Sequence, residues 1–220
     1  MNFKAEQMRA DFPALTTGLA LFDAPGGTQV PEQVADAIRE TMLSPISNRS
    51  PASLPGRNAE EAVHSFRLAA ADLMGADPKG VMHGRSSTQL TMDFSRALSK
   101  NWVSGDNIVL SKLDHDSNIA PWLIAAAHAG VEVRWAQFDA NTSELDTKQY
   151  QSLIDKRTQV VALTAASNFI GSKPEVSKIA AIAHAHNAYV YVDAVHYAAH
   201  DPLDIKTLGA DFTVVSPYKL

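Results

Sequence analysis

Four residues that could do chemistry stand shortly after runs of apolar, strand-forming residues. Asp193 closes the run AYVYV, Lys219 follows DFTVVS, His115 follows NIVL and Asn168 follows VVALTAAS. A carboxylate at the end of a buried strand loses hydration, so it needs a cation or hydrogen-bond donors. A lysine there can act as a desolvated amine that forms a Schiff base. An imidazole there can stack on a flat ring or move protons.

A further candidate is the segment GRSSTQL at 84–90, between a short apolar run and an amphipathic helical pattern. Ser87 and Thr88 are predicted N-cap residues, and hydroxyls with free N–H groups at a helix start bind phosphate well. Taken singly, each candidate also has a structural explanation. Ser87 and Thr88 can simply cap a helix, Asp193 can form a turn, and Lys219 can be a solvated surface residue.

Each candidate falls at the carboxyl end of a predicted strand. Because these ends lie along one edge of a parallel sheet, we expect the candidates to lie close together at this edge, the rim of the sheet. A phosphate anchor, a stacking imidazole, a carboxylate and a lysine together are what pyridoxal phosphate requires. The carboxylate keeps the pyridine nitrogen protonated, and the lysine holds the aldehyde as an imine. The combination therefore predicts a pyridoxal phosphate site.

The elements that must position these residues alternate between strand and helix along the chain, which predicts an α/β fold. The expected architecture is an open, mainly parallel sheet with helices on both faces. Helical periodicity covers about 31–43, 59–74, 88–102, 118–129, 146–156 and 174–186. Strands are predicted at Leu19–Phe22, Gly80–Met82, Asn107–Leu110, Val131–Gln137, Val160–Thr164, Ala188–Val192 and Asp211–Val215.

We divide the chain into an N-terminal segment, 1–30, and a cofactor-binding large domain, 31–220. The sequence ends at PYKL, just after the last predicted strand and one residue after Lys219. We therefore expect a fragment, or the first domain of a longer protein, with a small C-terminal domain absent.

The sequence resembles the class V aminotransferase family of fold-type I pyridoxal phosphate enzymes, in particular its cysteine desulfurase-like branch. The similarity covers nearly the whole chain. It is carried by LFDAPGGTQVP, GRSSTQL, GDNIVLSKLDHDSNIAPW, ALTAASNFIG, VYVDAVHYAAHDPLDIKTLGADF and VVSPYKL. The last two are the most specific, because an Asp-x-x-His strand end is followed one βα unit later by Ser-x-x-Lys.

The resemblance implies a role for each matching residue. Lys219 would be the Schiff-base lysine, Asp193 would pair with the pyridine nitrogen, and His115 would stack on the ring. The phosphate would be held by Ser87 and Thr88 with help from Ser216, and Asn168 and His196 would lie near the phenolic oxygen. The implied reaction is removal of sulfur from cysteine to give alanine. The implied assembly is a homodimer, and the implied substrate is a small molecule, an amino acid.

Two positions depart from the desulfurase pattern. His196 stands where desulfurases usually have Gln, and Tyr218 stands where they usually have His. Tyr218 can still donate a hydrogen bond to phosphate. Because Asp-x-x-His followed by Tyr-Lys also resembles kynureninase, a kynureninase-like hydrolase, an epimerase and an aminotransferase stay open as alternatives. A non-catalytic truncated module that acts through protein contacts is the alternative of a different class.

The composition of the sequence excludes several other classes of protein. The formal net charge of −5 argues against a nucleic-acid-binding protein, which needs a basic face. The sequence has no cysteine, which excludes a disulfide scaffold and cysteine-ligated metals within these residues. The N-terminus lacks the apolar core of a signal peptide, and no run is long enough to span a membrane. We therefore expect a cytoplasmic protein that does not bind membranes.

A metal site is the main chemical alternative to the predicted pyridoxal phosphate site. His184 and His186 are two residues apart, and His196 and His200 are spaced to share a helix face near Asp193. Imidazoles and a carboxylate suit zinc. However, no HExxH motif is present, and histidine is favoured electrostatically at a helix C-terminus. We therefore expect no metal. The sequence also lacks GxGxxG and Walker motifs, which argues against a dinucleotide or P-loop site.

Overall fold

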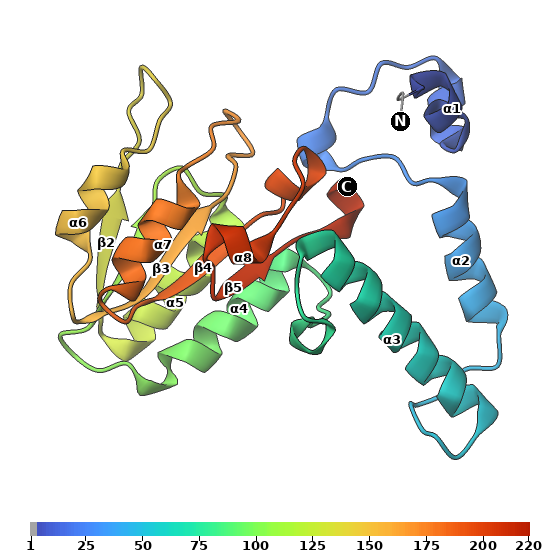
Figure 1. Cartoon of the computed structure of the whole chain (residues 1–220), viewed down its shortest axis with the longest axis horizontal. Coiled ribbons are helices and arrows are strands. Elements are labelled where there is room, and N and C mark those ends of the chain that lie inside the picture. The colour runs from blue at the N-terminus through green and yellow to red at the C-terminus, as the bar shows by residue number, and fades with distance from the viewer. Residues whose placement is uncertain (1–3) are drawn as a thin grey trace.

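A five-stranded parallel sheet forms the centre of the computed structural model, which describes residues 4–220 (Figure 1). The strand order is β2-β1-β3-β4-β5, and every neighbouring pair is parallel. This confirms the predicted α/β fold. The strands are β1 (Asn107–Ser111), β2 (Glu132–Ala136), β3 (Thr158–Thr164), β4 (Tyr189–Asp193) and β5 (Phe212–Val214).

Helices cover both faces of the sheet, because successive strand side chains point to opposite faces and both sets are apolar. On one face, α4 (Ser87–Leu98) and α5 (Ala120–Ala129) pack with Ile108 and Tyr191. On the other face, α6 (Tyr150–Leu153), α7 (Val176–His184) and α8 (Ile205–Leu208) pack with Val109 and Val190.

The N-terminal helices lie to one side of this body (Figure 1). They are α1 (Ala5–Ala10), α2 (Glu32–Leu43) and α3 (Leu54–Met74). Helix α3 begins five residues earlier than its predicted start at 59, because Ser53 caps it by accepting a hydrogen bond from the Gly56 N–H. No residue of α2 is buried.

Two predicted strands are wrong. Leu19–Phe22 lies outside the sheet, and the Phe22 side chain is 92% exposed. Gly80–Met82 begins in a 3-10 turn at Pro78–Gly80 and is also not a strand. An apolar run becomes a strand only when a partner satisfies its backbone groups, and neither run has a partner strand within residues 4–220.

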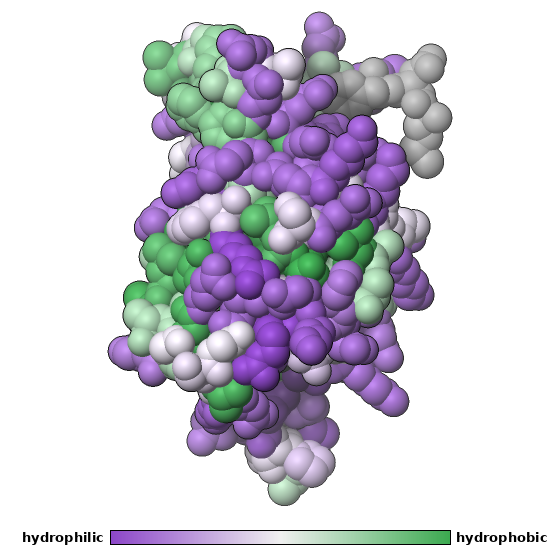
Figure 2. Space-filling view, turned by 90° about the vertical axis from the view of Figure 1, so that its left-hand side faces the viewer, coloured by the Kyte–Doolittle hydropathy of each residue, from purple (hydrophilic) through white to green (hydrophobic). Residues whose placement is uncertain are grey.

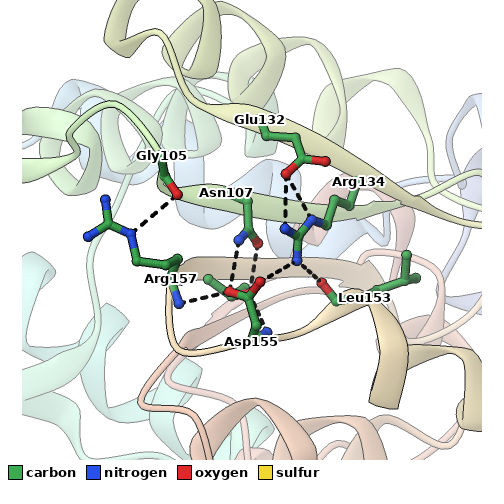
Figure 3. Close-up of polar contacts among 8 residues, drawn as sticks. Gly105, Asn107, Glu132, Arg134, Leu153, Asp155 and Arg157 are labelled. Atoms are coloured by element: carbon green, nitrogen blue, oxygen red, sulfur yellow. Dashed lines mark hydrogen bonds and ion pairs between the residues drawn. The ribbon is translucent and has the colours of Figure 1, made fainter.

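A polar cluster connects the amino ends of β1, β2 and β3 (Figure 3). The rim predicted for the site is at the carboxyl ends of the same strands. Asp155, in the turn before β3, accepts hydrogen bonds from Asn107 at 3.0 Å and from the Arg157 N–H at 2.8 Å, and it pairs with Arg134 at 2.8 Å. Arg134 also bonds to Glu132. The Arg134 guanidinium is the largest of the causes that lower the pKa of Asp155 to about 2.

Replacing Asp155 with Ala should lower the free energy of unfolding of the full-length protein by about 1–2 kcal/mol. The buried Asn107 amide and the Arg134 guanidinium would each lose a partner. Since the folded-state pKa is depressed, this stabilisation is present above about pH 4 and is lost as the pH falls toward about 2. Urea unfolding at neutral and acidic pH measures it. Glu60→Gln, at an exposed ion pair with Arg49 of 3.8 Å, is the control and should change little.

The side of the molecule drawn in Figure 2 is mainly hydrophilic, with apolar residues in patches between polar ones. Among residues 4–220, no helix is long and apolar enough to cross a membrane.

Candidate functional site

The carboxyl ends of the strands lie at one edge of the sheet, where the sequence places its candidates. Thr164 is in register with Asp193, and Asp193 is in register with Val214, so β3, β4 and β5 end side by side. His115 follows β1, Asn168 follows β3, His196 follows β4 and Lys219 follows β5. The parallel register is therefore what brings these distant segments together.

Asp193 is buried, with 6% of its surface exposed. Its Oδ1 accepts a hydrogen bond of 2.9 Å from the Val195 N–H. Burial raises the pKa of Asp193, whereas the Val195 N–H and the charges of His115 and Lys219 lower it. These two side chains, from the segments that follow β1 and β5, are thus close enough to act on the Asp193 carboxyl.

Lys219 lies in a 3-10 turn, Pro217–Lys219, that starts after the buried Ser216. Its Nζ is 5.5 Å from the ring centroid of Tyr218, which is itself exposed. Thr28 donates from its N–H and its hydroxyl, both at 3.1 Å, to the Tyr218 carbonyl oxygen. The N-terminal segment of the chain therefore anchors the turn that carries Lys219.

Gly27, beside Thr28, makes this anchoring possible. Its φ of 143° is a conformation that L side chains rarely adopt, and a Cβ there would lie 3.3 Å from the Tyr218 ring. Sequence reasoning assigned no role to residues 24–28. The Ala-Pro-Gly-Gly run was the available signal, since such runs form tight turns with close backbone contacts.

His115 and Asn168 line the same open cavity of about 270 Å³, together with Asp114. The Ser117 N–H donates to His115 Nδ1 at 3.1 Å, so the proton of the neutral imidazole is on Nε2. The His115 side chain is exposed, which leaves its ring free to meet a flat ligand.

His196 is partly buried, and its Nε2 is enclosed without a hydrogen-bond partner. Burial, followed by the charges of Lys219, His200 and His115, lowers its pKa. A neutral imidazole with an unpartnered nitrogen near Lys219 is suited to bind a polar group of a ligand.

Helix α4 starts one residue earlier than predicted. Ser86 is the N-cap, because its hydroxyl accepts from the Gln89 N–H at 3.1 Å, so Ser87 and Thr88 occupy the first helical positions. The prediction that Ser87 and Thr88 cap the helix is therefore wrong, although the helix start is where it was expected. Their N–H groups still have no partner within the helix, which suits an anion.

Hydrogen bonds of Thr91 connect the first turns of α4 to strand β4 of the sheet. Thr91 donates to the Ser87 carbonyl oxygen at 2.9 Å, and its hydroxyl is 3.0 Å from that of Tyr191 on β4. Helix α4 also packs against the 3-10 turn Asp116–Asn118, which follows His115.

The residues at this rim fit pyridoxal phosphate. Asp193 is a buried carboxyl that a ring N–H could satisfy, His196 offers an unpartnered nitrogen, and the first turn of α4 offers N–H groups to a phosphate. The side-chain amine of Lys219, which could bind the aldehyde of the cofactor, lies near both Asp193 and His196. Which atoms of the cofactor each residue meets stays a prediction.

Two of the four histidines considered as a metal site bind to other groups. His184 Nε2 is 3.0 Å from Asp211, and His186 Nδ1 is 3.0 Å from the Ile182 carbonyl oxygen. In the part of the chain that the structure describes, no three histidine or acidic side chains gather as metal ligands would.

Sequence reasoning missed two polar residues under the rim, Asp114 and Asn118. They hydrogen-bond to each other at 2.6 Å. The sequence offered no specific signal for them, because Asp114 precedes the 3-10 turn Asp116–Asn118 and Trp122 lies in the helix after it.

Comparisons with known proteins agree with this geometry. The family model described as aminotransferase class V matches residues 20–220. An uncharacterized Mycobacterium tuberculosis protein is 35% identical over 99% of the chain, and a Klebsiella pneumoniae cysteine desulfurase is 32% identical over all of it. The chain spans about half the length of these relatives, 55% and 56%. The apo structure of a Thermococcus onnurineus cysteine desulfurase superposes with a TM-score of 0.91 at 26% identity, covering 99% of this chain and 54% of that one.

Proposed function

Because this chain belongs to the class V aminotransferase family, we propose that its protein is a pyridoxal phosphate enzyme of the cysteine desulfurase type. It would remove sulfur from cysteine and leave alanine. The observation that carries the proposal is the buried Asp193 carboxyl at the end of β4. Burial raises the pKa of Asp193, and the nearby Lys219 and His115 side chains offset only part of that rise. The cysteine desulfurase relatives and the similar solved structure support it.

The proposed mechanism assigns one task to each side chain around Asp193. When bound, the cofactor supplies a protonated pyridine ring that draws electrons from the carbon carrying the substrate's amino group. Asp193 keeps the proton on the ring nitrogen. Lys219 would hold the cofactor covalently, and its amine would move the proton at the substrate Cα. His115 stacks on the ring.

Residues on either side of Lys219 and at the start of α4 hold the cofactor in place. Ser87 and Thr88, at the first positions of α4, bind the phosphate with Ser216 and Tyr218. Asn168 and His196 would lie beside the phenolic oxygen, to which the unpartnered Nε2 of His196 could bond. Removing sulfur also needs a thiol to accept it, and these 220 residues contain no cysteine. An assay must therefore allow for an added thiol.

The test is an incubation of the full-length protein with cysteine and dithiothreitol, with alanine and sulfide both measured. We expect equal amounts of the two products, and no product with Lys219→Ala. Kynurenine is the comparison substrate, because the Asp-x-x-His and Tyr-Lys motifs also resemble kynureninase. A failure to form alanine from cysteine, or a faster cleavage of kynurenine, would overturn the assignment.

Two further properties complete the proposal. We expect a homodimer in the cytoplasm, as in the family that the sequence resembles. Size-exclusion chromatography with light scattering checks the first, and fractionation of the source cells checks the second. A monomer or a membrane-bound protein would contradict them.

A further inference from the structure

A directional chain of hydrogen bonds runs under the candidate site. The Trp122 indole donates to Asn118 Oδ1 at 3.1 Å, and Asn118 Nδ2 donates to Asp114 Oδ1 at 2.6 Å. Trp122 is 0% exposed and Asn118 is 1% exposed. An indole N–H can only donate, so it fixes which end of the Asn118 amide faces Asp114. Asp114 Oδ1 must therefore accept.

The other oxygen of this carboxyl, Asp114 Oδ2, is enclosed and has no hydrogen-bond partner. It is the oxygen that can carry a proton, because Oδ1 is occupied as an acceptor. The Asp193 carboxyl is near enough to repel a charge on Asp114, and the hydroxyl of Tyr150 is also near. Ser111 and the backbone of Thr164 are the remaining polar neighbours.

Asp114 and Asp193 differ in their cationic neighbours. His115 and Lys219 act on Asp193, whereas no lysine, arginine or histidine among the described residues forms an ion pair with Asp114. Lys112, His115 and Asp116 line the same cavity, and all three side chains are exposed. Burial is accordingly the largest cause that raises the pKa of Asp114, to about 8. Two nearby carboxyls with different surroundings tend to divide into one acid and one carboxylate.

We propose that Asp114 is a positioning residue that works as a neutral carboxylic acid, protonated on Oδ2. Its Oδ1 ties the segment carrying His115 to the buried Asn118–Trp122 pair. Of the two neighbouring buried carboxyls, this neutrality leaves only Asp193 charged, free to pair with a cation of the ligand. The inference rests on the proposed function only where it pairs Asp193 with the pyridine nitrogen of the cofactor. The protonation state of Asp114 does not depend on any reaction.

The protonation of Asp114 can be read directly by infrared spectroscopy of the full-length protein. At neutral pH, the spectrum of wild type minus Asp114→Asn should contain the carbonyl band of a protonated carboxyl, and this band should disappear as the pH rises through about 8. Asp116→Asn, an exposed acid in the same segment, is the matched control and should give no such band. Absence of the band at neutral pH would overturn the proposal.

Stability provides a second readout that also needs no catalysis. The folded protein keeps a proton that the unfolded chain releases, because the folded-state pKa lies above the ordinary value of 3.8. The stabilisation is fully present below about pH 4 and is lost as the pH rises through about 8. The ratio of unfolding constants, wild type over Asp114→Asn, should therefore rise about tenfold or more between about pH 5 and about pH 8. A flat ratio would contradict the proposal.

A second variant protects the test if Asp114→Asn folds poorly. The Asn118 amide lowers the pKa of Asp114. Asn118→Ala should therefore keep the protonated band to a higher pH than wild type, and a shift to lower pH would contradict the proposal. Because both readouts are independent of turnover, a protein that shows the band but fails to form alanine from cysteine would overturn the proposed function alone.

Discussion

Replacing Lys219 with Ala should lower turnover of cysteine by roughly 10³-fold or more, because the only amine proposed to hold the cofactor and move the substrate proton is lost. The visible absorbance of bound cofactor should change as well, since the covalent attachment is gone. Steady-state kinetics and absorbance spectra of the full-length protein measure both effects.

The matched control for Lys219 is Lys178→Ala, an exposed lysine on α7 that pairs with Glu175 at the N-cap of the same helix. It should keep wild-type activity and absorbance. A Lys219→Ala protein that turns over cysteine at the wild-type rate, with an unchanged spectrum, would show that Lys219 is not the cofactor lysine.

Replacing Asp193 with Asn should lower kcat/KM by roughly 10²–10³-fold, the usual cost of removing one electrostatic group aimed at developing charge. Asparagine keeps the size of the side chain and an oxygen that can accept from the Val195 N–H. The variant therefore removes the charge with little change in packing. Without that charge the ring nitrogen loses its proton and draws electrons poorly.

The pH dependence of wild-type activity also tests the role of the Asp193 charge. Since burial raises the pKa of Asp193, protonation of this carboxyl should inactivate the enzyme at a higher pH than for an ordinary aspartate. Asp193→Asn should lack this acidic limb, and Asp72→Asn, at an exposed position on α3, should retain it. Wild-type kinetics in Asp193→Asn would contradict the role proposed for Asp193.

The sequence predicted the sheet well because each strand is a short apolar run between polar turns. The buried runs that became β1, β3 and β4 are examples, and their parallel pairing explains why Asp193, His115 and Lys219 meet. The predicted strand at Leu19–Phe22 was wrong because an apolar run alone does not make a strand. Its apolar pattern was present, but no partner strand pairs with its backbone.

Finer details depended on contacts that no local pattern contains. Ser86, Ser87 and Thr88 are all good caps, and only the backbone conformation of Ser86 decides among them. Asp114 and Asn118 resemble ordinary turn residues in the sequence. Their partnership depends on Trp122, whose indole is completely buried beside Tyr191, with ring centroids 5.1 Å apart.

The central claim is that Lys219 holds pyridoxal phosphate at the rim where Asp193 and His115 meet. The most direct measurement is to load the full-length protein with the cofactor, reduce it with borohydride, and map the modified lysine by peptide mass spectrometry. We predict one label per chain, on Lys219. A label on another lysine, a label spread over surface lysines, or no label at all would contradict the claim.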